Sequence, residues 1–209
     1  MTAPSPAPTS APGTAQPGEQ GMPDLREAVH AAQQWVAGLL AGVRPDQLRG
    51  ATPCEDFDVD ALVRHVFGIA DRLVVMGAGR AATDAAASIP ALPHDVVGDY
   101  RARVAQGRRA WTDPAALGRL VEAPFGQVPG AAVLGVYLAE NLTHGWDLAT
   151  ATGQDPEADP ALVAPAYATM RQVLPSEGRE GFPFAEAVEP AADARPTERL
   201  ANWTGRVSR

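Results

Sequence analysis

A glutamate, a histidine and an aspartate stand close together in the stretch ENLTHGWDLATATG, which covers residues 140–153. A helix brings residues four apart onto one face, so Glu140 and His144 are neighbours there, and Asp147 lies close to the same stripe. The apolar residues of this helix lie on the same side: Val133, Val136, Tyr137 and Leu148. A carboxylate on a buried stripe is unfavourable unless it is paired or bound to a metal. The spacing alone therefore leaves two interpretations open, an ordinary pair of neighbouring side chains on a helix and half of a metal site.

A second histidine, His65, stands in the upstream stretch DVDALVRHVFGIADRLVVMG. Its i−3 and i+4 neighbours, Leu62 and Ile69, are apolar, so we expect the imidazole to point toward the core. A lone histidine of this kind is typically hydrogen-bonded to a carbonyl. Together with Glu140 and His144, however, it makes a set of two imidazoles and one carboxylate with an open fourth position. That composition is typical of a catalytic zinc, and helical bundles build such sites from facing helices.

Other residues near these positions have less specific interpretations. Asp147 is expected either to orient His144 as a hydrogen-bond acceptor or to make a contact at the helix end. Trp146 is interpreted as packing or as a wall of the metal pocket. Cys54 stands before the second helix, where a helix N-terminus would lower its pKa, or it is a small residue packed in a turn. Two histidines lie off the ligand stripes and are expected to be surface or cap residues: His30 and His94.

The elements that position these residues are predicted to be helices. Apolar residues recur at helical spacing over five segments, at about residues 24–43, 58–77, 94–111, 131–151 and 160–173. Asp56 or Asp58 is the expected N-cap of the second helix, and Gly153 closes the fourth. Residues 120–130 are predicted to form a small strand or an extended connection, and residues 182–206 a strap with a short helical end. Residues 77–93 are predicted to form a loop, and whether it covers the pocket is left open. The fold class is therefore all-α, a four-helix bundle with an extra helix and a C-terminal strap.

Composition sets the domain organisation. With 209 residues, the chain is long enough for one ordinary domain. Residues 2–21 are rich in Pro, Ala, Ser and Thr, so they cannot bury enough apolar surface to offset their ordering entropy. We therefore expect a disordered extension over residues 1–22 and a single helical domain over residues 23–209.

Charge and cysteine usage exclude several classes of partner. The net charge is −8 and the isoelectric point about 4.9, which disfavours nucleic acid and anionic membranes, since both require a basic surface. No apolar run is long enough for a membrane span, and no secretory signal is evident. The single cysteine fits a reducing cytoplasm, so a cytoplasmic location is predicted. The oligomeric state, including a homodimer, is left open.

Two motifs together resemble a known family. The stretch TPCEDFDVDALVRHVFGIADRL, followed downstream by AENLTHGWDLATATGQ, resembles the DinB-like metal-binding superfamily. It is most similar to the actinobacterial branch related to the N-terminal domain of mycothiol-dependent maleylpyruvate isomerase. The closing stretch FAEAVEPAADARPTERLANWTGR also resembles the tail of that branch. The resemblance implies a DinB-like four-helix bundle with a divalent metal, usually zinc, whose ligands correspond to His65, Glu140 and His144.

The resemblance also implies a chemistry. The thiol of a cofactor, mycothiol, would take the open metal position as a thiolate and add to an electrophilic substrate, giving a transferase or an isomerase-like enzyme. The isomerase itself has a further C-terminal domain that is missing from this sequence, so we expect thiol binding rather than that specific isomerisation. Two alternatives remain open at this point. One is a metal-dependent hydrolase with Asp147 as its base, and the other is a non-catalytic, metal-stabilised binding module.

Overall fold

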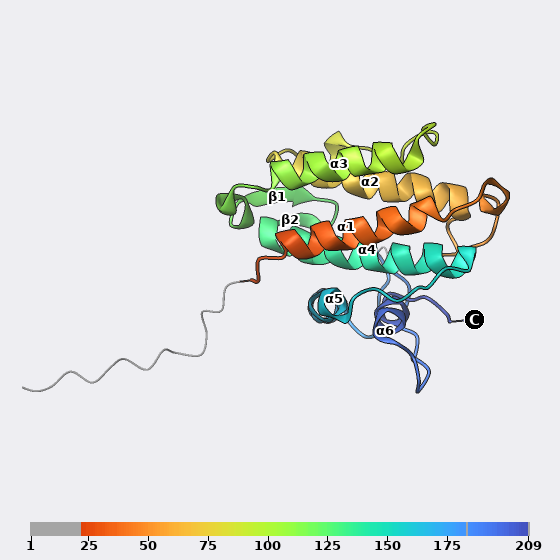
Figure 1. Ribbon diagram of the computed structural model, residues 1–209. Helices are drawn as coiled ribbons and strands as arrows, with labels where there is room; N and C mark the ends of the chain where they lie inside the picture. Colours follow the sequence, from red (N-terminus) through yellow and green to blue (C-terminus); the bar gives the residue numbers. More distant parts are fainter. Residues whose placement is uncertain (1–21, 183, 209) are drawn as a thin grey trace, which may run out of the picture.

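Four long helices lie side by side and form the body of the molecule (Figure 1). The computed structural model of the chain describes residues 22–182 and 184–208, so the extension predicted at 1–22 lies outside the described residues except for the exposed Met22. The bundle consists of α1 (Arg26–Ala41), α2 (Val59–Gly77), α3 (Val96–Ala110) and α4 (Gly130–Thr152). Two further helices pack below it, α5 (Pro160–Val173) and α6 (Pro196–Trp203). The predicted all-α bundle with an extra helix is confirmed.

Helix α4 is the central helix of the fold. It contacts α1 and α2 on one side and α5 and α6 on the other, so it is buried along almost its whole length. Such a helix is expected to be apolar all round, and α4 is indeed mostly apolar. Its polar residues are therefore buried together with the apolar ones: Asn141, Thr143, His144 and Asp147. Each of them must find a partner inside the protein or be served by a ligand.

The ends of the helices follow from local chemistry. Asp58, one of the two predicted caps, lies in extended conformation before α2 and accepts a hydrogen bond from the backbone N–H of Ala61 at 2.8 Å. Gly153 ends α4 with φ of 72°, a left-handed conformation that glycine adopts at no steric penalty. These two ends fix the start of the helix that carries His65 and the end of the helix that carries Glu140, His144 and Asp147.

Two connections differ in how they relate to the bundle. The segment predicted as a strand or extended connection is an antiparallel hairpin of β1 (Leu120–Ala123) and β2 (Gly126–Pro129), with Phe125 exposed at its turn. The loop over residues 77–93 contains a short 3₁₀ turn, Ala82–Asp84, and lies against α2. The backbone N–H of Ile89 donates to the carbonyl of Arg64 at 3.1 Å. The loop thus packs against α2 and is attached to it by this hydrogen bond.

The C-terminal segment passes back over α4. After α5 the chain runs through an irregular strap to α6, and the few residues after α6 lie against the end of α4. Gly205, with φ of 92°, makes a turn so close to Ala185 that a side chain at this position would overlap with it. This turn brings Arg206 to the buried face of α4. In the described part of the chain, no helix has the length and hydropathy that a bilayer crossing requires.

Candidate metal centre

Three side chains from two helices converge on one point. His65 comes from α2, and Glu140 and His144 come from adjacent turns of α4. One ligand atom from each of the three lies within 4.8 Å of the other two. The two imidazole rings are 4.9 Å apart at an angle of 80°, and Oε2 of Glu140 lies 4.0 Å from Nε2 of His65 and 3.6 Å from Nε2 of His144. The structure therefore brings together the trio that the sequence singled out.

The other nitrogen of each imidazole is held by an acceptor. Nδ1 of His65 lies 2.9 Å from the carbonyl oxygen of Ala87, and Nδ1 of His144 lies 3.1 Å from Oδ2 of Asp147. A carbonyl and a carboxylate can only accept, so in both neutral rings Nδ1 carries the proton and Nε2 carries the lone pair. The two Nε2 atoms, which lie next to Glu140, thus carry the lone pairs that could bind a metal. Acceptors of this kind are the usual partners of metal-binding histidines, because they set the tautomer and the orientation of the ring.

The separations around Glu140 suit a metal better than hydrogen bonds. A hydrogen bond between a nitrogen and a carboxylate oxygen is about 2.7–2.9 Å long, much shorter than the two distances observed here. Two atoms bound tetrahedrally to one zinc at about 2.1 Å lie about 3.4 Å apart, which is close to the 3.6 Å between Glu140 and His144 and somewhat shorter than the 4.0 Å between Glu140 and His65. Two nitrogens and one carboxylate oxygen also form a donor set that zinc accepts. The residues present therefore fit a divalent metal.

The charges at the site support each other. Burial opposes ionisation of Glu140, but the two histidines, when they are protonated, outweigh it and hold the pKa of Glu140 well below its usual range. Burial likewise disfavours the charged form of His144, but Asp147 and Glu140 outweigh it and raise the pKa of His144. Glu140 is therefore a carboxylate, with only 19% of its side chain exposed, in need of a positive partner.

Asp147 connects the trio to the C-terminal segment. Its side chain is 0% exposed, accepts from His144, and is paired with Arg206 at 3.2 Å. Of the two alternatives for Asp147, the structure shows the contact with His144. Arg206 had no signal in the sequence, because it follows Asp147 by 59 residues and reaches it only through the fold. The guanidinium also donates to the carbonyl oxygen of Thr204 at 2.9 Å, which holds it in place.

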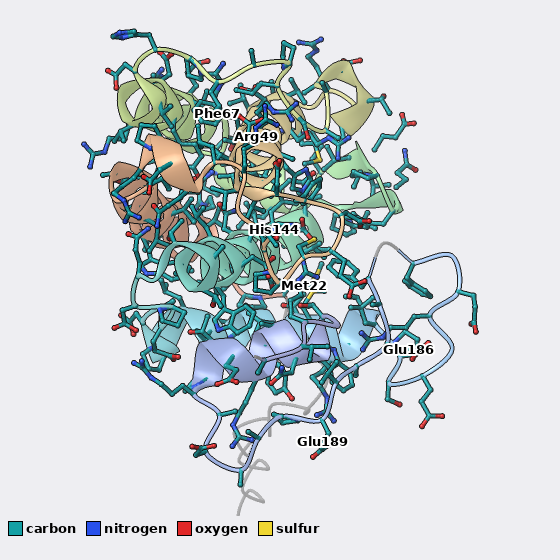
Figure 2. The ribbon with its side chains drawn as sticks, turned by 90° about the vertical axis from the view of Figure 1, so that its right-hand side faces the viewer. Met22, Arg49, Phe67, His144, Glu186 and Glu189 are labelled. Atoms are coloured by element: carbon teal, nitrogen blue, oxygen red, sulfur yellow. The ribbon has the colours of Figure 1, made fainter. Side chains whose placement is uncertain are left out.

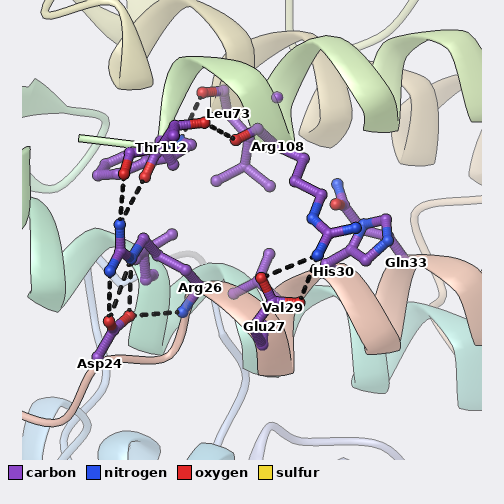
Figure 3. A pocket seen from close by; sticks show the side chains of 12 residues that line it. Asp24, Arg26, Glu27, Val29, His30, Gln33, Leu73, Arg108 and Thr112 are labelled. Atoms are coloured by element: carbon purple, nitrogen blue, oxygen red, sulfur yellow. Dashed lines mark hydrogen bonds and ion pairs between the residues drawn. The ribbon is translucent and has the colours of Figure 1, made fainter. Parts of the chain in front are cut away.

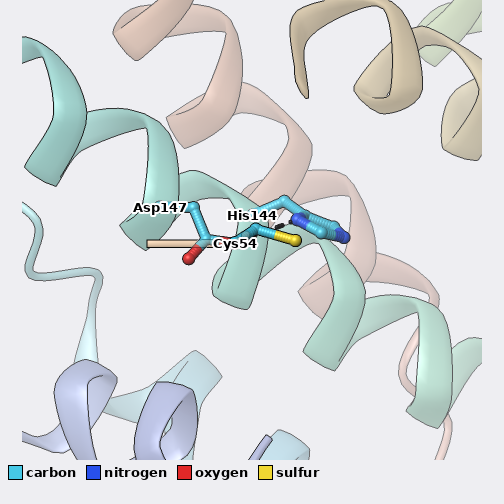
Figure 4. Close-up of side chains that lie close together, drawn as sticks. All are labelled: Cys54, His144 and Asp147. Carbon is cyan, nitrogen blue, oxygen red and sulfur yellow. Dashed lines mark hydrogen bonds and ion pairs between the residues drawn. The ribbon is translucent and has the colours of Figure 1, made fainter. Parts of the chain in front are cut away.

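Cys54 lies beside His144 and Asp147 (Figure 4). Its sulfur and one ligand atom from each of these residues lie within 4.8 Å of one another. The helix N-terminus does not lower its pKa, because burial, the largest effect, raises the pKa of the thiol. Cys54 is thus a half-buried thiol at the edge of the site, and its place in the TPC motif before α2 was the only sequence signal for it.

The trio lies in a cavity of about 860 Å³. His144 is near the middle of the molecule, while Glu186 lies on the C-terminal segment to one side (Figure 2). The ring of Phe57 stacks on His65 at 5.0 Å, and the hairpin turn and the C-terminal strap complete the apolar walls with Phe125, Phe184 and Val207. Of the two interpretations of Trp146, packing and a pocket wall, the structure shows packing, because Trp146 is buried and is not among the described residues that line the cavity. No described residue of the loop at 77–93 lines the cavity either.

A second, smaller cavity of about 420 Å³ lies between α1 and α3 (Figure 3). His30 lines it, so this histidine is more than a surface or cap residue as predicted from the sequence. Its Nδ1 and the Nε2 of Gln33 are buried without a hydrogen-bond partner in the described part of the chain. The ion pair between Arg108 and Glu27, 2.9 Å long, lies at the same cavity. None of these residues belongs to the group around Glu140.

Comparison with known proteins agrees with this geometry. The family described as mycothiol maleylpyruvate isomerase N-terminal domain matches residues 23–149. Two uncharacterized proteins from two strains of Mycobacterium tuberculosis are each 35% identical over 179 residues, which is 85% of this chain and 95% of the relative. No solved structure matches the chain.

The chain therefore belongs to the mycothiol maleylpyruvate isomerase N-terminal domain family. The family predicted from the two helix motifs is confirmed, and the matched region contains all three residues of the trio. The chain is thus a mycothiol-related, DinB-like protein whose structure holds a group of side chains suited to a metal ion.

Proposed function

We propose that this family member is a zinc-dependent transferase or isomerase-like enzyme that uses mycothiol as its thiol cofactor. The zinc ligands in this proposal are His65, Glu140 and His144. The observation that carries it is the direction of the two Nε2 lone pairs, which converge on Glu140 because both Nδ1 atoms are held by acceptors. Such a ligand set is preorganised, because the rings have the tautomer and orientation for metal binding before the metal binds.

The open side of the trio supports a reactive site over a structural one. No fourth His, Cys, Asp or Glu among the described residues joins the group around Glu140, whereas structural zinc sites have four protein ligands. When bound, the metal would supply a thiolate at neutral pH for addition to an electrophilic second substrate, since zinc deprotonates a coordinating thiol.

The chain itself contributes orientation and exclusion of water. Ala87 and Asp147 keep the proton of each imidazole on Nδ1, so that Nε2 stays available. The aromatic rings of Phe57, Phe125 and Phe184 line the cavity, and Phe57, which contacts both histidines, would exclude water from the trio. In such a low-dielectric site, charge interactions are stronger than in water. A second substrate with an apolar electrophilic part fits these walls.

A metal-dependent hydrolase is less well supported. It would need a general base within reach of the substrate, and Asp147 was the candidate close in sequence. The Asp147 carboxylate is fully buried, and its oxygens are occupied by His144 and Arg206. It therefore cannot accept a proton from a substrate in the cavity without losing both partners.

Calorimetric titration of the zinc-loaded protein with mycothiol tests the proposal. We expect binding to the zinc-loaded protein and none to a chelator-stripped control, because the thiol would bind through the metal. The His65→Ala variant should behave as the stripped protein does. Equal binding with and without zinc, or no binding to a protein that holds one zinc per chain, would contradict the proposal.

A further inference from the structure

Arg72 is a cation in the wall of the metal cavity without an acidic partner. Its Nε is buried and has no hydrogen-bond partner in the described part of the chain. In this acidic protein, the other buried or half-buried arginines have partners. Arg103 pairs with Asp71, Arg206 pairs with Asp147, and the guanidinium of Arg179 donates to backbone carbonyls. An arginine that lines a cavity and has a donor that the protein leaves unpaired is available to bind an anion.

Tyr137 adds a second donor at the same place. Its side chain is 4% exposed and lines the same cavity. Burial, the larger effect, raises the pKa of Tyr137, although the nearby Arg72 guanidinium opposes this. The hydroxyl therefore remains protonated and can donate, and Arg72 and Tyr137 together present two adjacent donors to the cavity.

These donors lie a defined distance from the metal ligands. Helices α2 and α4 run in opposite directions here, since His65 lies beside His144 and the later Arg72 lies near the earlier Tyr137. Arg72 follows His65 by seven residues, two helical turns, and Tyr137 precedes His144 by seven. At a rise of about 1.5 Å per residue, the donors lie about 10 Å from the histidines along the helices. Ile69 and Val136 line the cavity between the two positions.

The remaining charges of the cavity leave this end positive. Besides Glu140, the carboxylates that line the cavity belong to Glu55, Asp56 and Glu186. None of them forms an ion pair with Arg72 among the described residues. Glu186 accepts from the backbone N–H of Arg179, which engages one of its oxygens. The cavity thus has a ligand set for a metal at one end, apolar walls in the middle, and at the other end Arg72, with its unpaired Nε, next to the hydroxyl of Tyr137.

We propose that Arg72 and Tyr137 bind the carboxylate of an elongated ligand whose other end reaches the trio of His65, Glu140 and His144. This inference rests on the proposed function, because the trio must hold the metal that receives the ligand. Carboxylates are recognised by the planar fork of arginine through charge-assisted hydrogen bonds. The carboxylate belongs to the second substrate, because the cysteine carboxyl of mycothiol is held in an amide bond and carries no charge.

Thiols that carry a terminal carboxylate test this inference as molecular rulers. Mercaptohexanoic acid, the short mercaptoacetic acid and the methyl ester of each would be titrated into the zinc-loaded protein by calorimetry. We expect the long acid to bind about ten- to hundredfold more tightly than its ester, since only the acid gains a charged hydrogen bond. The short acid cannot reach Arg72 from the metal, so it should show no such advantage over its own ester.

Variants locate the effect. In Arg72→Met the long acid and its ester should bind equally, and Tyr137→Phe should reduce the difference between them. Arg109→Met, which removes an exposed arginine outside the cavity, is the matched control and should leave the difference unchanged. Zinc content and circular dichroism establish that each variant is folded, and the comparison of acid with ester on the unaltered protein does not depend on any variant.

Adding hexanoate to the mycothiol-saturated protein tests whether the carboxylate belongs to the second substrate. Binding that needs Arg72 and persists beside mycothiol supports this assignment, whereas displacement of hexanoate by mycothiol would contradict it. Equal zinc-dependent binding of the long acid and its ester to the unaltered protein would overturn the carboxylate inference and leave the proposed function intact. If no thiol binds in a zinc-dependent way, both fall.

Discussion

The buried pair of Arg206 and Asp147 is expected to be the strongest single link between the C-terminal segment and the metal ligands. Asp147 is 0% exposed and Arg206 is 9% exposed, so neither charge is well solvated once the other is removed. The perturbation is Arg206→Met, which keeps much of the side-chain volume and removes the charge.

Removing one partner of a buried ion pair typically destabilises a protein by about 3–5 kcal/mol, because the other charge stays buried without compensation. The lower end applies here for two reasons. The three contacts of Arg206 with Asp147 are 3.2, 3.3 and 3.4 Å long, which is longer than strong charge-assisted hydrogen bonds. Asp147 also keeps its bond with His144. We therefore expect a loss of about 3 kcal/mol in the free energy of unfolding.

The assay is urea unfolding followed by circular dichroism, in the presence of a chelator so that metal binding does not contribute. A double-mutant cycle with Asp147→Asn isolates the pair, and we expect the double variant to lose less than the sum of the single losses by about 2 kcal/mol. The matched control is Arg80→Met, which removes an exposed pair with Asp84 and should change stability little.

Additive losses within about 0.5 kcal/mol would refute the reasoning, because they would show that the two charges do not depend on each other. A loss below about 1 kcal/mol for Arg206→Met would do the same, since that is the range of solvated surface pairs.

Three further outcomes are expected. His65→Ala and His144→Ala should each abolish stoichiometric zinc binding by metal analysis while leaving helix content unchanged, whereas His94→Ala should retain the metal; zinc retained in both ligand variants would disprove the assignment. Carboxylate neighbours outweigh burial and raise the pKa of His144, so protons compete with the metal for this ring up to a higher pH. Zinc affinity should therefore rise with pH, and an affinity that does not change between about pH 5 and 8 would argue against this. Gly145→Ala would place a methyl group against the ring of Trp35, so it should lower the free energy of unfolding by about 1–3 kcal/mol. Thermal or urea unfolding measures this loss, and an unchanged free energy of unfolding would contradict the prediction.

Much of the fold follows from local patterns in the sequence. The apolar periodicity identified the helices of the bundle because each buries one stripe against its neighbours. Asp58 and Gly153 marked helix ends through side-chain capping and left-handed geometry, which depend on a few adjacent residues. The grouping of Glu140 with His144 was predictable for the same reason, since helical spacing alone places them side by side.

What the sequence by itself determined is thus the set of local relations: which segments are helical, where they end, and which side chains share a face. The tertiary structure alone decided which of these faces meet. It brought Arg206 to Asp147 across 59 residues, placed Cys54 beside His144, and left Arg72 without an acidic partner. These outcomes depend on the relative positions of helices and on the path of an irregular strap. Contacts between distant segments are selected by packing of the whole chain, so no local pattern encodes them.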